Sequence, residues 1–202
     1  MLSLYKKFIL PKLLNRGMGN VSFNETRAKI VSPAQGVVLE IGFGSGYNLP
    51  FYGNIEKLYA LEPAKELAAY AADRARAVSF PVEYLRCSAE AIPLPENSGD
   101  TVVSTWTLCS IPDVVKALQE VRRVLKPGGR FLFVEHGQHV KKINITLQKL
   151  ATPCTVACSG NCHLDRNIET LIRESGLHIE RIEMFPEEGR PLMYSYRGVA
   201  AK

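Results

Sequence analysis

Short apolar runs alternate with segments of helical periodicity through the middle of the chain. Runs rich in Val, Ile, Leu and Phe predict buried strands, and apolar residues three or four positions apart predict helices. Because the two kinds of segment alternate, we expect a parallel sheet with helices on both faces. Strands are expected at 36–42, 56–62, 81–87, 100–108 and 130–136, and helices at 64–78 and 112–126.

The pattern changes after residue 140. Residues 141–153 and 165–176 have helical spacing, and 177–185 and 192–202 have the pattern of a closing pair of strands. The first 32 residues are expected to form two helical pieces outside the sheet. No shift in composition marks a domain boundary, so we expect a single domain, as is usual for about 100–200 residues.

Composition and charge narrow the class of protein. The 202 residues have a net charge of +5 without a run of five like charges, so a nucleic-acid partner is not expected. Five cysteines, an odd number at this length, indicate free thiols in a reducing compartment. The basic and apolar N-terminus is interrupted at Pro11 and Lys12, and the chain contains no long apolar stretch, so neither a signal peptide nor a spanning helix is expected.

A glycine-rich loop, GFGSG at 42–46, directly follows the first strand. Glycine lets the backbone approach a ligand closely, and ligands of open α/β sheets bind at the carboxyl ends of strands. The dinucleotide fingerprint would need another glycine where Tyr47 stands. Glu62, at the end of the second strand, can accept hydrogen bonds from both hydroxyls of a ribose. Glu40 favours a cationic amino-acid group over a pyrophosphate.

Four stretches in this order resemble the motifs of class I S-adenosylmethionine-dependent methyltransferases. They are VLEIGFGSGYNLPFY, YALEP, CSAEAIPLPENSGDTVVSTWTLCSIPD and ALQEVRRVLKPGGRFLFVEHG, within about residues 25–137. The resemblance implies an α/β fold: a Rossmann-like, seven-stranded, mostly parallel sheet with an antiparallel C-terminal strand and a helical N-terminal cap. It divides the single domain into a cap at 1–32, a cofactor-binding core at 33–137, a lid or substrate segment at 138–176 and closing strands at 177–202.

Within this superfamily, LCSIPD, VEHG and GNCHLDRN look most like a subgroup related to thiol methyltransferase-like and ubiquinone/menaquinone methyltransferase-type proteins. Membrane-anchored members of that subgroup carry an N-terminal hydrophobic anchor, and this chain departs from them there. Its N-terminus carries Lys6, Lys7, Lys12 and Arg16 among apolar residues. It is expected either to cap the active site or to touch an anionic membrane surface.

The resemblance implies contacts with S-adenosylmethionine along the whole crevice. The loop glycines approach its methionine part, Glu40 lies near its amino group, Glu62 holds its ribose hydroxyls and Pro63 packs near its adenine. Trp106 and Cys109 have an alternative role as packing residues of the core. The implied cofactor-binding set is Glu40, Gly42, Phe43, Gly44, Gly46, Asn48, Leu49, Glu62, Pro63, Ser88, Ala89, Glu90, Thr105, Trp106, Thr107 and Cys109.

Two residues are candidates for acid–base chemistry. A methyl group on a sulfonium is already activated, so the protein mainly supplies proximity and orientation. His136, at the end of the fifth strand, has an ordinary pKa near 6.5 that suits a base for the acceptor. Asp113, just past CSIP, is the second candidate. The alternatives are a strand-capping hydrogen bond for His136 and a helix cap for Asp113.

The stretch CTVACSGNCH at 154–163 holds three of the five cysteines. Its spacing matches neither the zinc pattern C-x2-C nor the radical iron–sulfur pattern C-x3-C-x2-C, so no metal is expected. If Cys154 and Cys158 share a helix face, the following Gly-Asn pair can end the helix and turn the next residues inward. The resemblance favours Cys162, His163 and Arg166 as substrate-binding residues. A metal site, a thiol cluster for a soft acceptor such as trivalent arsenic, and an apolar lid wall remain the alternatives.

The expected function is methyl transfer from S-adenosylmethionine to a small, rather apolar acceptor. A thiol, a quinone precursor and a lipid head group all fit that description. The alternatives are a nicotinamide-dependent oxidoreductase and a non-catalytic sensor that uses Cys154, Cys158 and Cys162. The expected location is the cytoplasm, with attachment to a membrane surface as a variant of it.

Overall fold

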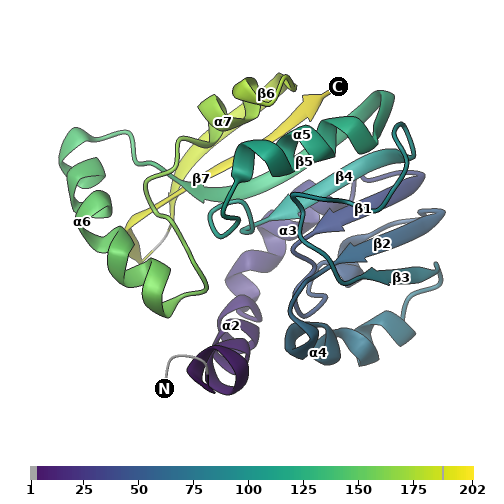
Figure 1. Cartoon of the computed structure of the whole chain (residues 1–202), viewed down its shortest axis with the longest axis horizontal. Helices are drawn as coiled ribbons and strands as arrows, with labels where there is room; N and C mark the ends of the chain where they lie inside the picture. The colour runs from purple at the N-terminus through teal and green to yellow at the C-terminus, as the bar shows by residue number, and fades with distance from the viewer. Residues whose placement is uncertain (1–3, 188) are drawn as a thin grey trace.

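The computed structural model describes residues 4–187 and 189–202. Its centre is a seven-stranded sheet in the order β3-β2-β1-β4-β5-β7-β6, in which β7 runs antiparallel to both neighbours (Figure 1). This confirms the predicted α/β fold with an antiparallel C-terminal strand. The strands are β1 Val37–Ile41, β2 Lys57–Leu61, β3 Val82–Leu85, β4 Gly99–Thr105, β5 Leu125–Gly137, β6 His178–Glu187 and β7 Arg190–Ala201.

Helices cover both faces of the sheet because alternate strand residues face opposite sides. On β1, Leu39 and Ile41 pack into the cluster formed with α5 and α7, whereas Val38 packs into the cluster formed with α3 and α4. The helices are π-helix η1 Tyr5–Ile9, α2 Leu10–Met18, 3-10 helix η2 Val21–Phe23, α3 Asn24–Val31, 3-10 helix η3 Leu49–Phe51, α4 Lys65–Arg76, α5 Val114–Val124, α6 Lys142–Cys158 and α7 Ile168–Glu174.

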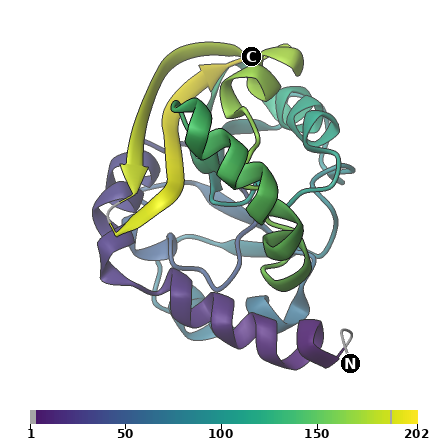
Figure 2. The same cartoon turned by 90° about the vertical axis from the view of Figure 1, so that its left-hand side faces the viewer.

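The first 32 residues do more than cap the sheet. The N-terminal helix η1–α2 and the helix α6 lie away from the sheet, on the side that faces the viewer in Figure 2. In contrast, α3 places Ile30 and Val31 in the core, where they pack on one face of the sheet. The segment predicted as an outer cap therefore contributes one helix to the fold itself. The part of this segment before Leu4 lies outside the described residues.

Several element boundaries differ from the predictions, and three of them bear on the site. The strand predicted to reach residue 108 ends at Thr105, because Trp106 has a left-handed φ of 52° that takes the chain out of the sheet. Helix α5 begins after Asp113, whose carboxylate accepts a hydrogen bond from Lys116 N at 3.1 Å. Helix α6 continues through Pro153 to Cys158. Within the described residues, no helix is long and apolar enough to cross a bilayer.

Candidate functional site

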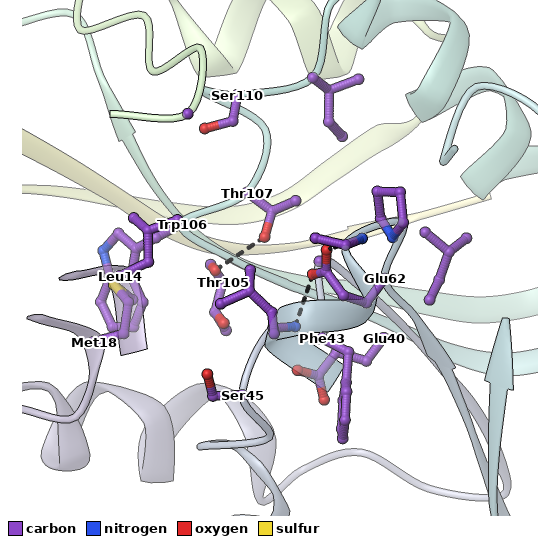
Figure 3. Close-up of a pocket in the computed structure, with 18 of the residues that line it drawn as sticks. Leu14, Met18, Glu40, Phe43, Ser45, Glu62, Thr105, Trp106, Thr107 and Ser110 are labelled. Atoms are coloured by element: carbon purple, nitrogen blue, oxygen red, sulfur yellow. Dashed lines mark hydrogen bonds between the residues drawn. The ribbon is translucent and has the colours of Figure 1, made fainter. Parts of the chain in front are cut away.

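A cavity of about 390 Å³ opens at the carboxyl ends of β1, β2 and β4 (Figure 3). Its volume falls in the range of small-molecule and cofactor sites. Figure 3 shows Leu14, Met18 and Trp106 at one side of the cavity and Glu62 at the other. The lining comes from residues 42–45, 61–64, 88–89, 105–107, 110–112 and 159–160, with Leu10, Pro11, Leu14, Met18, Arg27, Glu40, Tyr47, Asn48 and Leu67.

The glycine loop is shaped by what surrounds it. Gly42 and Gly44 both have left-handed φ angles, of 68° and 55°. A Cβ on Gly42 would collide with the side chain of Thr107, so only glycine fits between β1 and the loop after β4. A Cβ on Gly44 would meet nothing closer than Gly42 O at 3.7 Å. The bare backbone of Gly44, which lines the cavity, is therefore open to close approach by a ligand.

Glu62 joins this loop to the end of β2. One carboxylate oxygen accepts from Gly44 N and the other from Ala64 N, both at 2.9 Å. Burial raises the pKa of Glu62, and the two backbone hydrogen bonds oppose that shift. A carboxylate has roughly four acceptor positions, so two remain for a ligand in the cavity. The prediction placed this carboxylate correctly at the crevice.

Glu40 is buried deeper, at the end of β1. Its carboxylate accepts from Asn48 Nδ2 at 2.9 Å and from the Tyr52 hydroxyl at 2.6 Å. Burial raises the pKa of Glu40 to about 8, although both hydrogen bonds and the charge of Arg27 act in the other direction. Near neutral pH this group can therefore gain or lose a proton when the charge in the cavity changes.

Arg27 is a buried cation that the sequence analysis did not identify. Its Nη2 donates to Met18 O at 2.8 Å, and its guanidinium lies 5.1 Å from the centre of the Trp106 ring. Burial lowers its pKa to about 10. Nε and Nη1 of Arg27 are buried without a hydrogen-bond partner, as are Ser45 Oγ, Asn48 Oδ1 and Trp106 Nε1. These five polar atoms all belong to residues of the cavity lining, where a polar ligand would satisfy them.

The floor of the cavity depends on Glu135, which lies fully buried on β5. One of its oxygens accepts from Thr107 N at 2.8 Å and from Leu108 N at 2.9 Å, and the other lies 2.5 Å from the Ser104 hydroxyl. Burial raises the pKa of Glu135 well above its ordinary value, and the thiol of Cys109 adds to the shift. We did not predict this role, although the residue lies within the VEHG stretch.

The segment after α6 turns inward, as predicted, but it attaches to this floor. Gly160 and Asn161 have left-handed φ angles of 68° and 69° and turn the chain inward. His163 N then donates to Cys109 O at 2.9 Å, and Cys162 Sγ lies 3.6 Å from Cys109 Sγ. This thiol–thiol contact lowers the pKa of Cys162 and raises that of Cys109 well above its ordinary value.

Arg166 completes this attachment by donating from Nη1 to Leu108 O. The predicted substrate residues Cys162, His163 and Arg166 thus lie together beneath the floor, outside the cavity lining. Ser159 and Gly160 of the same segment do line it. Cys154 and Cys158 are exposed on α6, and within the described residues no group of three or more Cys, His, Asp or Glu is placed to hold a metal ion.

The two acid–base candidates lie outside the cavity lining. His136 is buried behind Trp106, with 6.2 Å between the ring centres, and its Nδ1 lies 2.8 Å from Glu187 Oε1. Burial raises the pKa of Glu187, but His136 and Ser195 outweigh it and the net shift is downward. Asp113 is exposed and caps α5, which was the alternative considered for it.

Most of the predicted cofactor contacts meet at the cavity. Those that line it are Glu40, Gly42, Phe43, Gly44, Asn48, Glu62, Pro63, Ser88, Ala89, Thr105, Trp106 and Thr107. Four predicted contacts do not: Gly46, Leu49, Glu90 and Cys109. Glu90 instead accepts from Asp113 N at 2.7 Å, and Leu49 is buried in the core. A cap over the active site was one expectation for the N-terminus, and α2 does line the cavity. No residue of 110–112 or 159–160 was predicted as a contact, although the LCSIPD and GNCHLDRN stretches include four of these five positions.

Comparison with known proteins shows which enzymes this chain resembles. Residues 39–133 match the family model of a methyltransferase domain. The chain is 33% identical over 134 residues to thiol S-methyltransferase TMT1B of Rattus norvegicus, which covers 64% of this chain and 54% of that protein. It is 30% identical over 122 residues to phosphatidylethanolamine N-methyltransferase of Cereibacter sphaeroides, covering 58% of this chain and 60% of the relative. The matches thus span little more than half of these relatives.

Solved structures share the fold. The crystal structure of the YcgJ protein from Bacillus subtilis superposes with a TM-score of 0.70 at 18% identity, over 90% of this chain and 97% of that one. An S-adenosylmethionine-dependent methyltransferase from Mesorhizobium loti gives 0.68 at 19% identity, over 92% and 99%. The seven-stranded sheet thus has the fold of S-adenosylmethionine-dependent methyltransferases of known structure, and residues 39–133 match a methyltransferase domain.

The pKa of Glu40 predicts that stability depends on pH. Between pH 4.5 and about 8 the folded protein keeps a proton on Glu40 that the unfolded chain releases. The free energy of unfolding should therefore fall as pH rises through this window, by roughly 1 kcal/mol per pH unit from this group, and level off above it.

Urea denaturation of the protein without added cofactor, at several pH values in this window, measures the effect. Glu40→Gln is the control, because the amide cannot titrate and the side chain of Asn48 can rotate to accept from it. The variant should lose that part of the slope. Equal slopes for both proteins would contradict the assignment.

Glu135 gives a second prediction. Replacement by Ala leaves Thr107 N and Leu108 N unpaired and should destabilise the fold by about 2–4 kcal/mol. Glu135→Gln should cost less than about 1 kcal/mol, because its oxygen can accept from both N–H groups and the Ser104 hydroxyl can accept from its amide. Urea unfolding of the two variants compares them. If Gln is as damaging as Ala, the site requires a charged carboxylate rather than a neutral acceptor.

Proposed function

We propose that this protein transfers a methyl group from S-adenosylmethionine to a small, rather apolar acceptor: a thiol, a quinone precursor or a lipid head group. The observation that carries the proposal is the position of Glu62, which both fixes the glycine loop and keeps acceptor capacity at the cavity. The opposite wall is apolar, because α2 contributes Leu10, Pro11, Leu14 and Met18 to it. One cavity thus offers a polar half for the cofactor and an apolar half for the acceptor.

The cavity residues fit the cofactor. Glu62 would hold the ribose hydroxyls, and Glu40 with Asn48 would lie at the amino-acid end. Arg27, with two unpaired buried N–H groups, has the charge and the donors for the carboxylate at that end. The bare Gly44 backbone admits the methionine part, and residues 105–107 form the surface beneath it. When bound, S-adenosylmethionine supplies a methyl group already activated for displacement.

The protein's own contribution is mainly positioning and exclusion of water. Glu135 fixes residues 105–108, and Cys162, His163 and Arg166 attach the segment after α6 to that floor. We propose these three as residues that position the acceptor side of the cavity. His136, held beside Glu187, and Asp113 stay predictions as bases. Separate alanine variants of His136, Asp113, Cys162 and His163 test each role through kcat, and unchanged turnover removes the residue from the mechanism.

Two rival functions lead to different binding behaviour. An oxidoreductase would bind NADH in preference to S-adenosylhomocysteine, and calorimetric titration with both compounds separates these cases. A sensor that uses the three cysteines of 154–162 would bind a metal. The separation of the exposed Cys154 and Cys158 from the Cys109–Cys162 contact supports the methyltransferase proposal instead.

We propose a cytoplasmic location, with the basic N-terminus available for a membrane surface.

The identity of the acceptor is tested by release of S-adenosylhomocysteine with a thiol, a quinol or a phospholipid. Glu62→Gln should weaken binding of S-adenosylhomocysteine roughly 10- to 100-fold, the loss expected for hydrogen bonds to a charged group. Titration calorimetry measures this change. Glu56→Gln, an exposed residue at the opposite end of β2, is the matched control and should bind normally. Normal binding by Glu62→Gln would refute the role given to this residue.

A further inference from the structure

The net positive charge of the chain comes from two segments that contain no acidic residue. Residues 1–24 and 136–164 hold seven of the 25 Lys and Arg residues and none of the 20 Asp and Glu residues. The rest of the chain therefore carries more acidic than basic residues. The seven cations are Lys6, Lys7, Lys12, Arg16, Lys141, Lys142 and Lys149. The two segments are far apart in sequence and contain η1–α2 and α6.

An ordinary surface helix buries its apolar stripe against the core. Helix α6 does the opposite and exposes its apolar stripe. The side chain that it buries most fully is Gln148, which donates to Gly137 O at 3.0 Å and Leu192 O at 2.9 Å. The apolar side chains of Ile143, Leu147 and Leu150 are 66%, 42% and 74% exposed. Their spacing of four and three residues places them on one face of the helix. A polar contact thus holds α6 to the protein while an apolar stripe points outward.

The N-terminal helix presents a similar surface. Phe8, Ile9 and Leu13 are 53%, 51% and 54% exposed, and the spacing of four residues between Ile9 and Leu13 suits one helix face. Leu10 and Leu14 lie on the cavity side. The Tyr5 hydroxyl donates to Cys158 O at 2.6 Å and joins this helix to the end of α6. Figure 2 shows both helices on the same side of the molecule, with the lower end of α6 beside the N-terminal helix. We call the exposed side chains of these two adjacent helices the α6 face: Phe8, Ile9 and Leu13 with Lys7 and Lys12 on one helix, and Ile143, Leu147 and Leu150 with Lys142 and Lys149 on the other.

The cavity lies beside this face. Its lining includes Leu14 and Met18 from the N-terminal helix and Ser159 and Gly160 from the chain directly after α6. The same two elements therefore form the outer surface and the wall of the acceptor half. An amphiphile whose apolar part rests against the α6 face would therefore lie next to the elements that wall the cavity.

We infer that the α6 face docks on an anionic lipid bilayer and that the methyl acceptor is an amphiphile resident in that bilayer. The second part rests on the proposed methyl transfer, whereas the first does not. Helices with exposed apolar side chains, with lysines and with no acidic residue of their own match helices that lie in the plane of a negatively charged membrane. A second copy of the same face is disfavoured, because it would bring two cationic surfaces together.

Co-sedimentation with vesicles tests the docking. The full chain should bind vesicles that contain roughly one third phosphatidylglycerol at least tenfold more tightly than pure phosphatidylcholine vesicles, and high salt should weaken that binding. Lys142→Glu/Lys149→Glu and Ile143→Ser/Leu150→Ser should each lower the affinity at least tenfold. The matched control is Lys65→Glu/Lys116→Glu, which reverses two exposed cations outside the α6 face and should bind like the parent.

Calorimetry with S-adenosylhomocysteine keeps this inference separate from the proposed function. Both α6 variants should bind that compound normally, since none of their substituted residues lines the cavity. Equal binding of the parent to both kinds of vesicle, or full binding by the Lys142→Glu/Lys149→Glu variant, would overturn the docking. A dimer in solution that is lost in the Ile143→Ser/Leu150→Ser variant would also overturn the docking, because the α6 face would then join two copies of the chain. Vesicle binding without any response to S-adenosylhomocysteine would refute the methyltransferase proposal alone.

Discussion

The buried carboxyl group of Glu135 fixes the geometry on which the rest of the site depends. It accepts hydrogen bonds from Thr107 N and Leu108 N, just after the chain leaves the sheet at the end of β4. With these bonds in place, Trp106 adopts its left-handed conformation and Thr107 lies against the glycine loop. That contact is why position 42 has no room for a side chain. A single interaction on β5 thus sets the floor of the cavity and the shape of the loop opposite it.

The same floor holds the segment that returns after α6. Cys109 O and Leu108 O receive hydrogen bonds from His163 N and Arg166 Nη1, and the thiols of Cys109 and Cys162 are in contact. Loops normally lie at the surface with their polar groups in water. A loop that packs against the protein interior, as this segment does, needs hydrogen-bond partners for its buried backbone groups. The consequence here is that Ser159 and Gly160, far along the chain from the glycine loop, are held at the same cavity.

The sequence was informative where one local signal determines the structure. Strand and helix periodicity predicted the succession of strands and helices along the chain, and the glycine loop with Glu62 marked the polar half of the cavity. The roles of Arg27 and Glu135 were not predicted, because each residue contacts groups that are distant in the sequence. Arg27 lies on a helix with little amphipathic character, and only the tertiary structure buries its guanidinium against Trp106. Glu135 lies in an apolar strand, where the sequence does not show which N–H groups it will meet.

This difference explains why the sequence predicted the residues of the polar half of the cavity, proposed for the cofactor, better than those of the apolar half, proposed for the acceptor. The cofactor half is built from loops that directly follow β1, β2 and β4, and the order of strands in an open α/β sheet fixes where these loops meet. The acceptor half joins α2 to residues 159–160, which lie on the two sides of the core in sequence and meet through contacts such as Tyr5 with Cys158. In a fold shared by many enzymes, specificity depends on such added segments. The polar attachment of Gln148 adds a constraint, because with Gln148 held against Gly137 O and Leu192 O the apolar stripe of α6 faces away from the core.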